Sequence, residues 1–252
     1  MSDRAISGTL GVMNLSQFHP TRRKLIRTLL MGACLSPALM AVLKAGSAAQ
    51  QEPITQGFQT VDGDVRLNGR PAQVGMVVRP TDVCTTGADG SCVIIIGEHV
   101  FLLRENAEVE FEVEHFEEGF DTSRTVTQRI RVAAGALLGG FANTQATIDT
   151  PLATIGIRGT GLYVEAHADR DYVCLCYGKA ELHPKLKPSL VQHLDTFHHE
   201  TPRNLFADPL AHGGRVIAPE KMINHQDEEL IMLEALVGRI PLFGPEPIKM
   251  PS

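Results

Sequence analysis

Alternating polar and apolar positions mark the middle of the chain. Glutamates at 108, 110, 112 and 114 alternate with Val109, Phe111 and Val113. In a strand this pattern puts carboxylates on one face and apolar side chains on the other. Because the same alternation recurs at 129–132, we predict a hairpin in which Glu108 faces Arg131 and Glu110 faces Arg129. Carboxylates fanned along a flat strand do not converge as calcium ligands must, so we interpret them as a solvated, salt-bridged face.

Shorter strand signals surround this hairpin, whereas a helical pattern occurs once. An Asn68-Gly69 turn follows the alternating run at 64–67, β-branched residues fill 93–96, and glycine-punctuated apolar runs continue to residue 182. Apolar residues recur at helical spacing only at 230–237, which predicts a helix over about 226–238 with Asn224 and Asp227 as its capping box. The predicted fold class is therefore mainly β with one C-terminal helix.

The first fifty residues have the three-part plan of a secretory signal. Arg22 and Arg23 precede an apolar stretch from about Leu25 to Leu43, and a run of small residues ends at Ala49. An arginine pair before a moderately apolar core is typical of a twin-arginine signal. We therefore predict residues 1–49 as a signal peptide that is cleaved near Ala49, and a periplasmic mature protein.

Two other interpretations of this segment are weaker. A membrane anchor needs about 20 strongly apolar residues, and here Arg27, Ser36, Pro37 and Lys44 interrupt the stretch. A lipid attached at Cys34 would leave only a short apolar core after Arg27. We expect no stable membrane span in the mature chain.

Removal of the signal would leave a strongly acidic protein. Residues 1–49 hold six Lys/Arg and one Asp, a net charge of +5, while the whole chain carries −6, so the remainder carries about −11. Such a chain repels phosphate backbones, which argues against nucleic acid as a partner.

The composition changes near His183, where Pro and His become frequent and β-branched runs end. We therefore divide the mature chain into a β domain at 54–182 and a C-terminal appendage at 183–252, docked through its helix. Cys84 and Cys92 flank a turn-like run in the β domain. On a hairpin they would lie within disulfide reach, and two buried thiols are the alternative.

Several of these segments together resemble the FecR domain. They are the run at 65–72, the turn at 86–90 with the Val/Ile strand that follows, and above all Thr150-Pro151 leading into Ile157-Arg158-Gly159-Thr160-Gly161. The resemblance spans about residues 60–166. It implies an all-β domain of stacked, solenoid-like or sandwich-like sheets outside the cytoplasm. In the regulatory members of the family, this domain passes a signal from an outer-membrane receptor inward to a sigma factor.

This sequence departs from that regulatory plan, because no segment resembles a cytoplasmic anti-sigma region and its one membrane-like stretch reads as cleavable. We expect a non-catalytic exported relative that binds a small ligand or a cell-envelope partner, with envelope signalling as one form of that role. Neither a Gly-x-Ser-x-Gly elbow nor a His-Glu-x-x-His motif occurs in the sequence, so we predict that the protein is not an enzyme.

The segment around Arg158 and Thr160 invites comparison with a phosphate loop. That motif needs a helix after its glycines, and here a strand-like run follows at 162–164. Arg158 is expected to anchor nearby carbonyls. Contact of Arg158 and Thr160 with an anion or a partner is the alternative.

A Cys-x-Cys motif followed by histidines predicts an alternative function, periplasmic metal binding. Cys174 and Cys176 would share one face of a strand, so both sulfurs could reach one ion. The later histidines are His193, His198, His199, His212 and His225. Two thiolates and two imidazoles would bind zinc, or copper in a distorted geometry. We expect only one of the adjacent His198 and His199 to coordinate, with His212 or His225 as the fourth ligand. Disulfides with Cys84 or Cys92, or unpaired thiols, are the other options.

The signal interpretation gives the first prediction. Replacing both Arg22 and Arg23 by Lys should leave unprocessed precursor in the cytoplasm, because the twin-arginine machinery reads the arginine pair. Immunoblots of fractionated cells measure this, with the unchanged chain as control. Normal export of the variant would count against this route.

Overall fold

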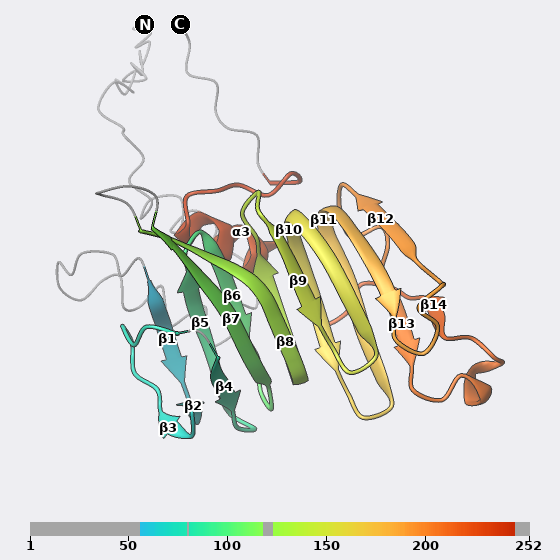
Figure 1. Ribbon diagram of the computed structural model, residues 1–252, viewed down its shortest axis with the longest axis horizontal. Helices are drawn as coiled ribbons and strands as arrows, with labels where there is room; N and C mark the ends of the chain where they lie inside the picture. The colour runs from blue at the N-terminus through green and yellow to red at the C-terminus, as the bar shows by residue number, and fades with distance from the viewer. Residues whose placement is uncertain (1–55, 80, 118–122, 245–252) are drawn as a thin grey trace, which may run out of the picture. The chain divides into compact units, whose positions relative to one another are not determined.

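Strands carry most of the fold, and they bend between two layers (Figure 1). The computed structural model describes residues 56–79, 81–117 and 123–244, with the backbone alone at 113–117 and 123–128. The predicted signal peptide lies outside these residues. The described strands connect into one sheet through their pairings, and the mainly β prediction is confirmed.

The first layer contains the acidic hairpin. It runs in the order β3 (Arg70–Pro71), β2 (Val65–Leu67), β4 (Asp82–Thr86), β7 (Glu108–Glu117), the first part of β8 (Ser123–Gly140), β9 (Gln145–Asp149), the first part of β10 (Ala153–Ala166), the last part of β11 (Arg170–Pro184) and β12 (Gln192–Thr196). The β8–β9 pair is parallel, and the other pairs are antiparallel.

The second layer uses the remaining halves of the same long strands. Its order is β1 (Gly57–Asp62), β5 (Ser91–Ile96), β6 (His99–Leu103), the end of β8, the end of β10, the start of β11, β13 (Arg203–Phe206) and β14 (Ile217–Pro219). β8, β10 and β11 therefore belong to both layers and join them covalently.

Glycines lie where two of these strands pass between layers. Gly135 divides β8 with a φ of 74°, and a Cβ there would lie 2.4 Å from the backbone of Ala107. In β10 a bulge at 158–161 contains Gly159, whose φ is 60°. Only glycine adopts this backbone freely and allows so close an approach.

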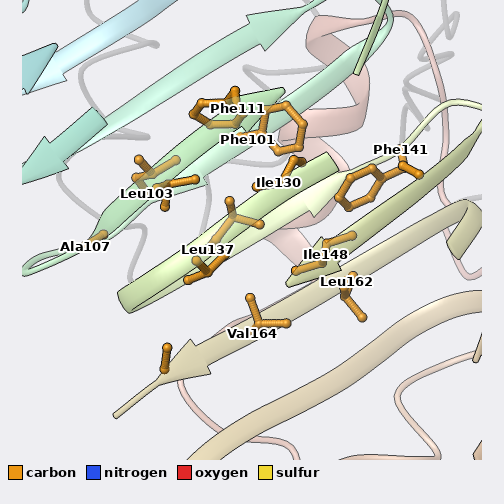
Figure 2. Close-up of a cluster of buried hydrophobic side chains, with 14 of the residues drawn as sticks. Phe101, Leu103, Ala107, Phe111, Ile130, Leu137, Phe141, Ile148, Leu162 and Val164 are labelled. Atoms are coloured by element: carbon orange, nitrogen blue, oxygen red, sulfur yellow. The ribbon is translucent and has the colours of Figure 1, made fainter. Parts of the chain in front are cut away.

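The main core lies between the layers. Phe101, Phe111 and Phe141 pack with centroid separations of 5.3–5.5 Å, and aliphatic side chains from β8, β9 and β10 surround them (Figure 2). Alternate residues of β6 and β10 point into this core, and the residues between them point to the opposite face.

That opposite face of the second layer carries a second apolar cluster, which includes Leu102, Leu138 and Tyr163. Leu230 and Leu233 of helix α3 (Asp227–Leu236) pack on it. Buried Glu229 pairs with Arg104 at 2.8 Å, and buried Glu234 accepts from Tyr177 at 2.6 Å, so polar contacts also fix the helix.

The helix prediction is confirmed, but its cap differs. Gln226 is the N-cap and Glu229 completes the capping box, whereas Asn224 takes a left-handed conformation with a φ of 57° two residues earlier. None of the helices in the described part of the chain is long and apolar enough to cross a membrane.

The acidic hairpin forms with a different register from the predicted one. Glu110 faces Arg131 and Glu112 faces Arg129, each pair 3.9 Å apart, and irregularities in the pairing lie on both sides of these pairs, at Glu108/Val109 and Glu112/Val113. The two-residue shift preserves which side faces the core. The side chains of Val113 and Glu114 lie outside the described residues.

The appendage is more than a docked helix. Its strands β12 and β13 pair with β11, and β14 extends the sheet by one strand. These strands are only three to five residues long, which is too short to give a recognisable run of β-branched residues in the sequence.

The buried hairpin face gives a stability prediction. Phe111 is fully buried, and replacing it by Ala should lower the free energy of unfolding by about 3–5 kcal/mol through lost burial and a cavity. Glu112→Ala is the matched control, since Glu112 is exposed and its replacement should change the free energy of unfolding little. Chemical denaturation of both variants measures this, and the reverse order would contradict the register.

Candidate metal centre

Strand β11 supplies two cysteines to the outer face of the second layer. Cys174 and Cys176 are both fully buried. Leu175, between them, and Val173, which precedes Cys174, point into the main core. The pleat of the strand thus puts both sulfurs on the same side.

Two histidines from the appendage meet these sulfurs. His199 follows β12 with a φ of 51°, and its backbone N–H donates to the Cys176 carbonyl at 3.0 Å. His225 lies two residues before α3 and is 4% exposed. The backbone bond at His199 and the docking of α3 bring both imidazoles over β11.

The four ligand atoms converge tightly. Cys174 Sγ lies 3.4 Å from His199 Nδ1, Cys176 Sγ lies 3.6 Å from His225 Nε2, and the two nitrogens are 3.1 Å apart. All four atoms lie within 4.8 Å of one another. A tetrahedral zinc site, with Zn–S about 2.3 Å and Zn–N about 2.0–2.1 Å, would separate S and N by about 3.6 Å and the nitrogens by about 3.3 Å.

Outer partners turn the inner nitrogens toward the cluster as acceptors. His225 Nδ1 lies 2.7 Å from the Ile223 carbonyl, so Nδ1 carries the proton and Nε2 presents its lone pair. His199 Nε2 lies 3.0 Å from Asp227 Oδ1, close enough for an ion pair although not aligned as a regular hydrogen bond. That carboxylate favours the proton on Nε2. The inner nitrogens therefore face each other with lone pairs, a repulsion that a shared proton or a metal ion removes.

The two thiols differ in acidity. The hydrogen bond from Cys176 lowers the pKa of Cys174 to about 3 despite its burial, and a proton shared between His199 and His225 would act in the same direction. Burial and the neighbouring Cys174 thiolate raise the pKa of Cys176 well above its usual value. Cys174 therefore loses its proton more readily than Cys176, and the deprotonated thiol is the form that binds a metal.

Aromatic rings close the surroundings of this cluster. The Tyr163 ring stacks on His225 with centroids 4.4 Å apart, and Phe243 lies 5.4 Å from the His199 ring. Such an apolar shell excludes water and strengthens coordination. The four-ligand set is closed, as structural zinc sites are.

Of the other predicted ligand candidates, His198 lies beside the cluster, in a group with His199 and Asp227, whereas His193 and His212 lie elsewhere. His198 is half-exposed and bonds Asp227 at 2.7 Å, so it supports the same carboxylate that contacts His199. His212 stacks on Phe206 with centroids 3.7 Å apart, and His193 pairs with Glu181 on the surface.

Arg158 and Thr160 do not form a common site. Arg158 is exposed and donates from Nε to the side-chain carbonyl oxygen of Asn143 at 3.4 Å. Thr160 is fully buried inside the β10 bulge. An anion at this position would meet only one of the two side chains.

The hairpin that motivated a Cys84–Cys92 disulfide does not form. Cys84 lies in β4 of the first layer and Cys92 in β5 of the second, and these strands do not pair. The sulfurs instead meet across the main core at 3.9 Å, and both thiols are free. The loop at 87–90 crosses between the layers because it joins β4 to β5. The Gly87 N–H donates to the carbonyl of Asp64, just before β2.

Sequence reasoning missed Asp227, the Ile223 carbonyl and Tyr163 as supports of the cluster. Asp227 was considered only as a helix cap, and a backbone carbonyl leaves no trace in a sequence. The spacing Ile223-x-His225-x-Asp227 was the available signal, since alternate residues of an extended segment can serve one site.

Comparisons with known proteins give one weak structural similarity. No family model and no curated protein matches the chain. Two crystal structures of a "putative anti-sigma factor" from Parabacteroides distasonis are similar, with a TM-score of 0.40 and 12% identity over 55% of this chain. The match spans 60% of that protein's solved chain. The resemblance to the FecR domain therefore stays a prediction.

The burial of Cys84 and Cys92 gives a prediction about their reactivity. Both are fully buried, so in the folded protein they should resist alkylation and react only after unfolding. Mass spectrometry of iodoacetamide-treated native and denatured protein measures this. Rapid labelling of either residue in the native state would show that the core between the layers opens.

Proposed function

We propose that this protein is a non-catalytic metal-binding protein whose Cys174, Cys176, His199 and His225 hold a structural zinc ion. The observation that carries the proposal is the convergence of two sulfurs and two inward-facing nitrogens at tetrahedral spacing in a buried site. Two thiolates and two imidazoles suit zinc, and copper(I) is the principal competitor for soft ligands.

The ion would fasten the appendage to the β domain. Two ligands come from β11 and two from the segment after β12, so coordination cross-links parts of the chain 25 to 49 residues apart. The segment it fixes carries α3, which covers the second apolar cluster. Metal binding would therefore contribute directly to folding stability.

This proposal fits the exported, FecR-like binding protein expected from the sequence. A closed metal site leaves no coordination position for a substrate, which supports a binding role rather than catalysis. Periplasmic location, a cell-envelope partner and a part in envelope signalling belong to the same proposal, and the export variant described above tests its first element.

The decisive experiment is elemental analysis of the mature protein, purified without a histidine tag. Wild type should contain about one zinc per chain, and Cys174→Ser should lose it, because a thiolate ligand disappears. Chelation should lower the melting temperature of wild type, and zinc should restore it.

Matched controls are available within the chain. Cys84→Ser removes another buried thiol and His212→Asn another histidine, and both should retain the metal. If Cys174→Ser fails to fold, cobalt exchange into wild type should give thiolate-to-cobalt absorption. Metal-free wild type with no affinity for zinc or cobalt would refute the site, and copper at the same stoichiometry would refute zinc alone.

A further inference from the structure

A polar cavity of about 700 Å³ lies beside the candidate metal centre. It shares two residues with the surroundings of that centre, because Tyr163 stacks on His225 and Asn224 immediately precedes it. Small residues of β8, including Gly135 and Ala136, form part of its wall and leave it open. The volume is large enough for a small polar molecule.

A buried carboxylate organises the wall. Glu165 is 3% exposed, and its Oε1 accepts from the Tyr163 hydroxyl at 2.8 Å and from Asn224 at 2.7 Å. Its Oε2 lies 3.0 Å from His167 Nε2 and 3.7 Å from Arg170. With four donor groups around it, Glu165 has little capacity left for a ligand.

The capacity that remains belongs mostly to donors. Arg104 donates from Nη2 to Glu229 and its guanidinium lies 5.8 Å from the centroid of the Tyr163 ring, which leaves the N–H groups of Nη1 for a ligand. Arg170 donates from Nη1 to Asn204 at 3.1 Å, which leaves other N–H groups of its planar fork for a ligand. Glu105, the other carboxylate of the wall, is exposed.

Donor-rich walls around a saturated carboxylate select ligands that bring acceptors. We infer that this cavity binds a small molecule bearing a carboxylate or phosphate group, with Arg170 and Arg104 as its recognition residues. Guanidinium groups match both oxyanions with paired, charge-assisted hydrogen bonds. The inference goes beyond the metal site, and neither depends on the other.

The acidity of the chain makes the expected binding local. A net charge of −6 on the full chain opposes the approach of anions at long range. The affinity for an anion would therefore come from the hydrogen-bond donors that line the cavity. A single exposed arginine elsewhere on the surface would not supply such a set of donors.

Calorimetric titration of the mature, metal-loaded protein with inorganic phosphate and, separately, with succinate tests the inference. At least one probe should bind saturably at a single site. Arg170→Gln should weaken that binding by about tenfold, the loss expected for one charge-assisted hydrogen bond. Binding by phosphate alone would assign a phosphate-bearing ligand, and binding by succinate alone a carboxylate-bearing one.

Two further variants separate the cavity from general effects. Ala168→Trp adds bulk at an exposed wall position and should block binding while leaving both arginines in place. Arg158→Gln removes an exposed arginine outside the cavity and should leave binding unchanged. Metal content is measured on every sample, so loss of the metal is recognised independently. The inference would be overturned if neither probe bound saturably. It would also be overturned if Arg170→Gln and Ala168→Trp both bound the probe as tightly as wild type does.

Discussion

The strict alternation of side chains along β11 is the constraint on which the rest of the structure depends. Val173 and Leu175 fill the core between the layers, while Tyr172, Cys174 and Cys176 occupy the opposite face. A shift of one residue would exchange the two sets and put both thiols into the apolar interior. The same alternation therefore secures the main core and presents two sulfurs to the appendage.

Burial of this polar cluster is costly unless every group has a partner. Cys174, Cys176, His199 and His225 are all at most 9% exposed, and unpaired buried polar groups each cost on the order of 1–3 kcal/mol. On the outer side, Asp227 contacts His199 and the Ile223 carbonyl accepts from His225, which offsets part of this cost. On the inner side the four atoms mostly face one another, with Cys176 Sγ also 3.7 Å from the Cys174 carbonyl, so a cation among them would add to the stability of the appendage.

Local patterns predicted much of this molecule, and the limits follow from long-range packing. The helix at 227–236, the Asn68-Gly69 turn and the common face of Cys174 and Cys176 each depend on neighbours in sequence, so periodicity and turn chemistry were sufficient. That His225 rather than His212 reaches the cluster depends on how the appendage packs on β11. That Cys84 meets Cys92 depends on how the two layers pack against each other. The predicted register of the acidic hairpin was wrong by two residues, because the alternating pattern marks which face is buried and does not mark irregularities in the pairing.

The order of the four ligands along the chain has a consequence for biosynthesis. Cys174 and Cys176 emerge from the ribosome first, His199 follows, and His225 comes 49 residues after Cys176. A nascent or truncated chain that stops before His225 has at most three of the four groups and lacks α3. Tight retention of a metal ion would thus distinguish chains that include His225 from shorter ones, so that the ion reports synthesis through the start of α3 as well as folding.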